Sequence, residues 1–121
     1  MVAVRAIRGA TQLERDEREH LLASVEELFS AVLNANALHT DDLISVLFTA
    51  TPDIRSEFPA VAARQLGIGD VPLLCTQELD IAGGLPLVVR LMAHVETPLA
   101  RADVRHVYLR GAVALRRDLA Q

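Results

Sequence analysis

The sequence contains no lysine and no tryptophan, and its aromatic residues are only three phenylalanines and one tyrosine. Aliphatic side chains must therefore build any hydrophobic core. Because lysine is absent, all 12 basic residues are arginine. A compositional bias of the genome is the favoured explanation, but arginine is also the residue best shaped for forked recognition of carboxylates.

Other scarcities exclude broad classes of protein. The single cysteine, Cys75, cannot form an internal disulfide and suits a reducing compartment. No apolar run reaches the roughly 18 residues that span a bilayer, and Arg5 and Arg8 interrupt the region where a signal peptide has its apolar centre. The net charge of −4 provides no general attraction to nucleic acid. We therefore expect a cytoplasmic protein that binds neither membrane nor nucleic acid.

The usual signatures of metal, nucleotide and nucleophile sites are also missing. The histidines have no HxxxH spacing, and the sequence has no CxxC, GxGxxG, P-loop or GxSxG motif. We therefore expect neither a metal nor a cofactor. Cys75 lies within the apolar segment LLCTQ. A structural thiol is favoured there over a nucleophile, because a reactive thiolate needs a base and an electropositive setting.

What is present predicts one domain over residues 1–121, since dividing so short a chain would leave neither half enough core. The clearest element is a long helix, in which Asp16 and Glu19 predict a capping box at the start and Asn36 predicts the end. Its apolar stripe follows three-four spacing: Leu21, Leu22, Val25, Leu28, Phe29, Val32 and Leu33.

Five apolar segments predict strands, at residues 2–10, 44–50, 71–78, 87–96 and 105–109. Pro59 predicts the start of a short helix that Gly67 closes. The fold class is therefore α+β, a mixed five-stranded sheet packed on one long helix. One helix covers one face of such a sheet, so the other face, also apolar by its sequence, predicts a homo-oligomer.

Four residues could carry chemistry because they interrupt or end apolar strands. Arg90 lies in the middle of its segment, Glu78 ends another, Arg8 precedes Gly9, and Tyr108 lies in the last strand. Burying a charge costs free energy unless another group pairs with it. On the residues alone, each of them also has a purely structural explanation. The arginines could lie at an edge and reach water, Glu78 could be a surface carboxylate, and Tyr108 could be a core aromatic.

Motifs along nearly the whole chain resemble those of monofunctional chorismate mutases of the trimeric α/β AroH class. They are specific in order and spacing: IRGAT (7–11), ERD (14–16), SVLFTATPD (45–53), EFPAVAAR (57–64), VPLLCTQELDIAGGLPLVVRLM (71–92), RHVYL (105–109) and LRRDL (115–119). The resemblance implies a homotrimer with a pseudo-barrel fold and active sites in clefts between neighbours. It also implies a cofactor-free Claisen rearrangement of chorismate to prephenate, in the biosynthesis of aromatic amino acids.

The resemblance also assigns roles to residues. It makes Arg90, Glu78 and Arg8 catalytic, and it implies that the substrate is bound by Arg8, Leu74, Cys75, Thr76, Gln77, Glu78, Arg90 and Tyr108, with Phe58 and Arg64 from an adjacent chain and Leu115 and Arg116 from the tail. Val61 departs from the pattern because some relatives have a lysine there, and Leu74 stands where relatives can carry a hydroxyl. Both departures concern charge and polarity at the cleft entrance.

The residue types suit this reaction, which needs no nucleophile and no proton transfer. A site must hold the folded conformer and place positive charge where the ether oxygen becomes negative. Arg90 would reach that oxygen, Arg8 and Tyr108 would hold a carboxylate, and Glu78 would accept a hydrogen bond from the ring hydroxyl. Two alternatives are a trimeric enzyme similar to the reactive-imine deaminases and a non-catalytic trimer that binds a small carboxylate. The motif string argues against the first, and the retained candidate positions argue against the second.

Overall fold

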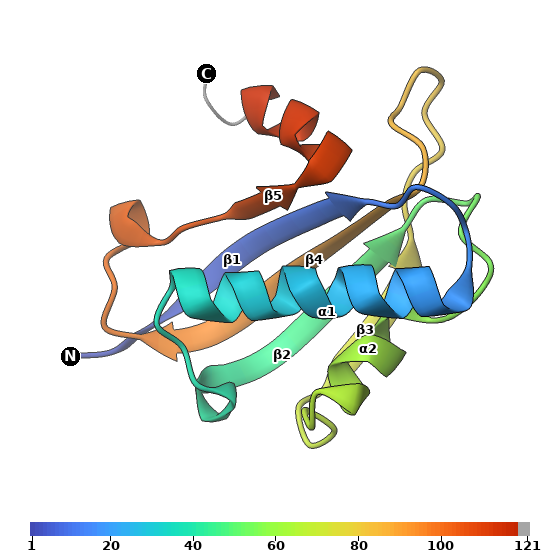
Figure 1. Cartoon of the computed structure of the whole chain (residues 1–121). Helices are drawn as coiled ribbons and strands as arrows, with labels where there is room; N and C mark the ends of the chain where they lie inside the picture. Colours follow the sequence, from blue (N-terminus) through green and yellow to red (C-terminus); the bar gives the residue numbers. More distant parts are fainter. Residues whose placement is uncertain (119–121) are drawn as a thin grey trace.

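The computed structural model describes the backbone of residues 1–118 and the side chains as far as Leu115. The elements that form the fold are β1 (Ala3–Gln12), α1 (Arg18–Ala35), β2 (Leu43–Ala50), α2 (Pro59–Gln65), β3 (Leu73–Gln77), β4 (Val88–Thr97) and β5 (Val107–Leu109). Three 3-10 helices join or follow them: η1 (Thr40–Asp42), η2 (Arg101–Asp103) and η3 (Arg110–Asp118). The predicted α+β fold, a mixed five-stranded sheet against one long helix, is confirmed (Figure 1).

The sheet has the strand order β3-β2-β4-β1-β5, so β4 is its central strand. β4 is antiparallel to β1 and to β2, whereas the two outer pairs, β2 with β3 and β1 with β5, are parallel. Arg90 of β4 lies opposite Ala10 on one side and Thr49 on the other. An edge position for this arginine is therefore excluded.

α1 begins one residue after a cap that differs from the predicted one. The carboxylate of Glu17 accepts the backbone N–H of His20 at 2.7 Å, so Glu17 and not Asp16 is the N-cap. The predicted capping box at Asp16 is wrong because that carboxylate accepts the backbone N–H groups of Arg55 and Ser56, at 2.9 and 3.1 Å. Short-range sequence spacing does not reveal this contact, which joins residues about 40 positions apart.

Asn36 ends α1, as predicted, and its side chain also limits the length of β5. Asn36 is the C-cap, and its side chain donates to the Val32 and Arg105 carbonyl oxygens, both at 2.9 Å. Its Oδ1 also accepts the N–H of Arg105 at 2.8 Å. Because Asn36 occupies both backbone groups of Arg105, the strand predicted from residue 105 begins only at Val107.

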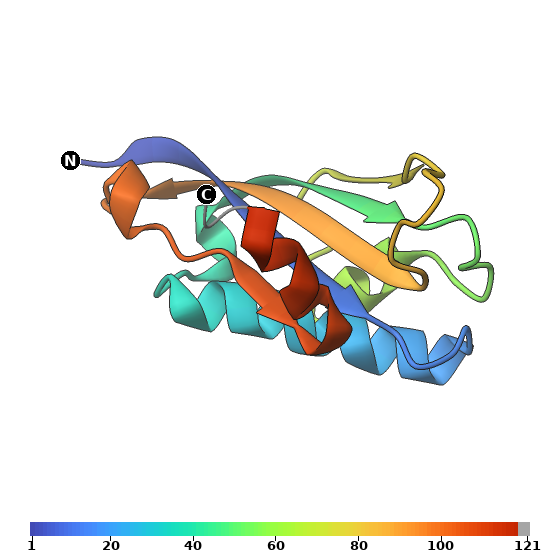
Figure 2. The ribbon, with the colours of Figure 1, turned by 90° about the horizontal axis from the view of Figure 1, so that it is seen from above.

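The two faces of the sheet differ. Figure 2 shows α1 and α2 on the same face, where the core gathers Ile7, Val25, Leu28, Phe29, Val46, Phe48, Val89 and Leu91. Gly9 allows the close approach of α1, since a Cβ there would lie 3.1 Å from Val32 Cγ2 and 3.2 Å from Leu28 Cδ1. No helix of residues 1–118 covers the opposite face, and η3 packs beside β1 and β5 at that edge of the sheet.

The opposite face is less apolar than the sequence predicts. Strand alternation directs Val89 and Leu91 toward the core and places Arg90 and Met92 on the other side. Leu47 and Leu74 lie on this uncovered face and are 37% and 58% exposed. Polar residues alternate with the apolar ones there, so the face combines exposed leucines with a potential binding site.

Candidate active site

A pocket of about 390 Å³ opens on the uncovered face beside β1, β4 and β5. It is lined by Arg8, Gly9, Leu47, Thr49, Glu78, Arg90, Leu91, Met92, Tyr108 and Leu115, and we call it the Arg90 pocket. The register of the sheet explains the grouping, because Arg8 lies opposite Met92 while Tyr108 lies opposite Ala10, the partner of Arg90. Three strands thus direct polar side chains into one space.

The centre of the Arg90 pocket is an ion pair. Arg90 Nε lies 3.1 Å from Glu78 Oε1, and the Thr49 hydroxyl donates to the same oxygen at 2.6 Å. The backbone N–H of Glu78 continues the β2–β3 pairing by donating to the Ala50 carbonyl oxygen at 2.9 Å. The Glu78 side chain is only 18% exposed, so its carboxylate has a defined position. Within the described residues Arg90 pairs through Nε, which leaves its terminal nitrogens available to a ligand.

Arg8 and Tyr108 form the other side of the pocket. The backbone N–H of Arg8 donates to Nδ1 of His106 at 2.9 Å. Burial lowers the pKa of His106, and the positive charge of Arg8 lowers it further. Two guanidinium groups and one carboxylate line the pocket, so its charged residues sum to a positive charge and favour an anionic ligand.

Leu115 reaches the Arg90 pocket from η3, which follows β5 directly. An ion pair holds the start of this segment against α1, with Arg110 3.3 Å from Glu27. Such an exposed pair contributes little stability, so the segment lies over the pocket mainly through its packing beside β1 and β5. The side chain of Arg116, also predicted to bind substrate, lies outside the described part of the chain.

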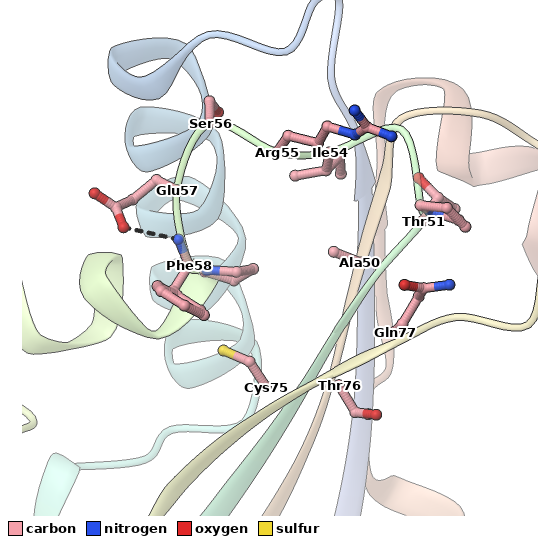
Figure 3. Close-up of a pocket in the computed structure, with 12 residues that line it drawn as sticks. Ala50, Thr51, Ile54, Arg55, Ser56, Glu57, Phe58, Cys75, Thr76 and Gln77 are labelled. Atoms are coloured by element: carbon pink, nitrogen blue, oxygen red, sulfur yellow. Dashed lines mark hydrogen bonds between the residues drawn. The ribbon is translucent and has the colours of Figure 1, made fainter.

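A second cavity of about 410 Å³ contains most of the remaining predicted residues (Figure 3). It lies beside the β2–α2 loop and β3 and is lined by Ala50, Thr51, Pro52, Ile54, Arg55, Ser56, Glu57, Phe58, Pro59, Cys75, Thr76 and Gln77; we call it the Cys75 cavity. In Figure 3, the side chain of Cys75 points toward Phe58, whereas that of Thr76 points away from Phe58. Cys75 is a half-buried free thiol.

The carboxylate of the Cys75 cavity, Glu57, is engaged locally. The Glu57 carboxylate accepts the backbone N–H of Phe58 and pairs with Arg18 Nε, each at 2.9 Å. These two contacts, the backbone one first, lower the pKa of Glu57. Phe58 itself is 67% exposed, which is unusual for so large an aromatic side chain. This cavity therefore combines an exposed aromatic edge with one further charged lining residue, Arg55.

The structure thus separates the predicted site residues into groups. Arg8, Glu78, Arg90, Tyr108 and Leu115 meet in the Arg90 pocket, while Phe58, Cys75, Thr76 and Gln77 line the other cavity. Leu74 is exposed on the uncovered face next to Leu47, and Arg64 is exposed in the last turn of α2.

Sequence reasoning missed five residues that line the Arg90 pocket. All of them belong to predicted strands, but none was identified as a site residue: Gly9, Leu47, Thr49, Leu91 and Met92. The signal for Thr49 was its place in ISVLFTA, where a polar side chain shares a face with Leu47. Its hydroxyl directly contacts the Glu78 carboxylate, so it belongs to the ion-pair centre.

The described residues show neither a metal-ligand cluster nor a membrane-spanning helix. No group of three or more histidine, cysteine, aspartate and glutamate side chains is arranged to hold a metal ion in this part of the chain. None of its helices combines the length and apolar character of a membrane span.

Comparison with known proteins relates the chain to one family. Residues 4–119 match the family described as chorismate mutase type I. The sequence is 42% identical to chorismate mutase AroH of Bacillus subtilis (strain 168) over 118 residues, covering 97% of this chain and 93% of that protein. It is 46% identical to chorismate mutase AroH of Thermus thermophilus over 117 residues, covering 96% of each. The solved structure of a chorismate mutase from Clostridium thermocellum aligns with a TM-score of 0.90 at 39% identity, covering 91% of this chain and 98% of that one.

Proposed function

The chain belongs to the type I chorismate mutase family, as its motifs predicted, and we propose that the Arg90 pocket is where it acts on chorismate. The protein is an isomerase that converts chorismate to prephenate in the biosynthesis of aromatic amino acids. The deaminase and the non-catalytic binding trimer are not favoured. The observation that carries the assignment of the site is the Arg90–Glu78 pair facing a pocket that also contains Arg8 and Tyr108.

The reaction asks for little chemistry from the protein. Chorismate is a dianion, and in one unimolecular step its ether C–O bond breaks while a C–C bond forms. No proton, electron or group is exchanged with the protein. The barrier falls when the site holds the folded conformer and stabilises the negative charge that develops at the ether oxygen.

Arg90 is suited to stabilise that charge. It lies on the central strand, between Ala10 and Thr49, so the backbone around it is constrained on both sides. Its Nε is held by Glu78, and its terminal nitrogens would donate to the ether oxygen and to an adjacent carboxylate. Because the guanidinium is already oriented, little reorganisation is required as charge develops.

The remaining groups would orient the substrate. Arg8 and Tyr108 would hold the other carboxylate, and Glu78 would accept a hydrogen bond from the ring hydroxyl. The carboxylate also balances the charge of Arg90 when the site is empty. The positive sum of the lining charges matches a dianionic substrate.

A homotrimer with shared sites is part of the proposal. The Arg90 pocket is open on the uncovered face, where Leu74 is also exposed, while Phe58 and Arg64 are exposed at the start and in the last turn of α2. Exposed aromatic and leucine side chains of this size favour a protein interface. We take Phe58 and Arg64 of one subunit to close the Arg90 pocket of its neighbour, with the Cys75 to Gln77 segment lining the cleft. A reducing cytoplasm, in which Cys75 stays a free thiol, is the proposed compartment.

Val61 changes the charge that would face such a cleft. It is half-buried and packs against the core, at a position where the resemblance implies a lysine in some relatives. Arg64, one helical turn further along α2, then supplies the positive charge on this side. We expect substrate attraction to the entrance to depend on Arg64 more than it does in relatives that have the lysine.

The test is the loss of chorismate absorbance on adding the purified chain, with prephenate identified by chromatography. Chelator-treated protein should retain its turnover, and light scattering should give a trimer. A stable monomer at micromolar concentration would remove the shared cleft. Turnover of a reactive imine to ammonia without turnover of chorismate would move the protein to the deaminase alternative.

A further inference from the structure

Arg8 is held by a side chain that does not line the Arg90 pocket. Its backbone N–H donates to His106 Nδ1 at 2.9 Å. His106 immediately precedes β5, and the β1–β5 ladder starts with the next pair, Gly9 with Val107. Because β5 has only three residues, this side-chain contact is a large part of what joins it to β1 beside Arg8.

The other side of Arg8 faces a third cavity, of about 360 Å³. It is lined by Val4, Arg5, Ala6, Arg8, Met92, Arg101, Val104 and His106. The charged groups that face His106 there are Arg5 and Arg8 of β1 and Arg101 of η2, and no carboxylate is among the lining residues that the structure describes. A protonated His106 would add a further positive charge to this group.

The hydrogen bond requires a neutral ring. A protonated imidazole carries N–H on both nitrogens and cannot accept the Arg8 N–H. Burial and then the charge of Arg8 lower the pKa of His106, which keeps the ring neutral and accepting at physiological pH. As pH falls below the ordinary histidine value of 6.5 and through this lowered pKa, the bond is lost.

We propose that His106 is a positioning residue for Arg8: its neutral ring orients Arg8 for the substrate carboxylate, and its protonation weakens substrate binding. This inference rests on the proposed function, which assigns the carboxylate to Arg8. His106 lines neither the Arg90 pocket nor the ion pair in it, so it acts through the β1–β5 contact that holds Arg8.

The test compares His106→Ala with His106→Asn in the trimeric enzyme. Alanine removes the acceptor, whereas the Asn side chain offers an oxygen near the place of Nδ1 and does not titrate. We expect His106→Ala to raise KM about threefold to tenfold, the factor that one neutral hydrogen bond contributes. kcat should change by less than about twofold, because Arg8 would hold the carboxylate equally in ground and transition states. His106→Asn should restore KM.

A pH series supplies the second readout. In the wild type, KM should rise as pH falls below about 6.5, whereas KM of His106→Asn should not rise over the same interval. The substrate and the other residues of the site are the same in both proteins, so the ratio of their KM values isolates His106. This comparison remains decisive if His106→Ala fails to form the trimer.

Three outcomes would overturn the inference. They are an unchanged KM in His106→Ala, a fall in kcat and in thermal stability without a change in KM, and parallel pH profiles of the wild type and His106→Asn. Failure of the proposed function looks different, since Arg8→Ala would then leave KM unchanged. If Arg8→Ala raises KM while His106→Ala does not, only the inference on His106 is wrong.

Discussion

The Arg90 pocket and the Cys75 cavity differ in how their side chains are held. The first is built on the central strand of the sheet, and its Glu78 carboxylate is 18% exposed and contacts both Thr49 and Arg90. The second lies between an edge strand and a loop, and Phe58 at its border is 67% exposed. Charge that must be oriented before the reaction thus lies where the backbone is most constrained, while exposed apolar groups lie where a neighbour can cover them.

Replacing Arg90 should test this contrast most strongly. Arg90→Met keeps much of the side-chain length but removes the charge at the ether oxygen, so kcat should fall by about 10²–10³-fold, the usual loss for one oxyanion donor. Arg55→Met at the Cys75 cavity is the matched control and should change kcat by less than about threefold, within the range of a surface substitution. Near-normal turnover of Arg90→Met would make Arg90 structural.

Removing the charge of its partner should have the next largest effect. Glu78→Gln keeps the shape but no longer balances Arg90, so kcat/KM should fall roughly tenfold to a hundredfold, as for a hydrogen bond to a charged group. Thr49→Val, which removes only the 2.6 Å hydroxyl contact, should cost about threefold to tenfold. An equal loss in both variants would mean that Glu78 acts through its position and not its charge.

A substitution at the Cys75 cavity should change substrate binding in the Arg90 pocket of the neighbouring subunit. Phe58→Ala should raise KM roughly tenfold, as truncation of an interfacial aromatic anchor does. Trimers reassembled from mixed Arg90→Met and Phe58→Ala subunits should then exceed both parents in kcat/KM, because some clefts combine an intact pocket with an intact Phe58. If mixing gives only the average of the parents, the two regions do not share a site.

The thiol of the Cys75 cavity should matter little for chemistry. Because no proton moves in the rearrangement, kcat should stay nearly constant over about pH 5–9, even where KM changes. Cys75→Ser should retain activity to within about threefold, since a thiol donates only a weak hydrogen bond. A kcat that rises with pH, together with complete loss in Cys75→Ser, would instead indicate a thiolate nucleophile.

The smallest expected effect concerns the loop beside the Cys75 cavity. Burial acts to raise the pKa of Asp16, but the nearby Ser56 side chain and the hydrogen bonds from the Arg55 and Ser56 N–H groups outweigh it and lower the pKa below 3.8. The associated stability is present above 3.8 and is lost as pH falls through the lowered pKa. Thermal melts of Asp16→Asn should therefore depend less on pH below about 4 than melts of the wild type. Identical acid dependence would contradict this role.

Local patterns in the sequence predicted an element well where its apolar residues follow a single regular spacing. The stripe from Leu21 to Leu33 lies on α1, and Asn36 ends that helix as predicted. The cap at Asp16 was wrong because a distant loop competes for its carboxylate. The last strand was predicted too long because Asn36, 69 residues away, occupies the backbone of Arg105.

For the candidate site, the sequence by itself determined which residue types were available and, through the order of its motifs, the family to which they belong. Only the tertiary structure decided that Thr49 donates a hydrogen bond to Glu78, the partner of Arg90, and that the Arg8 N–H donates to His106. It also decided that Cys75 lies in a separate cavity. The physical reason is strand register. The sequence of each strand shows which of its side chains share a face. The pairing of the strands decides which residues of two strands become neighbours. The paired strands lie tens of residues apart in the sequence, so no local pattern specifies how they pair.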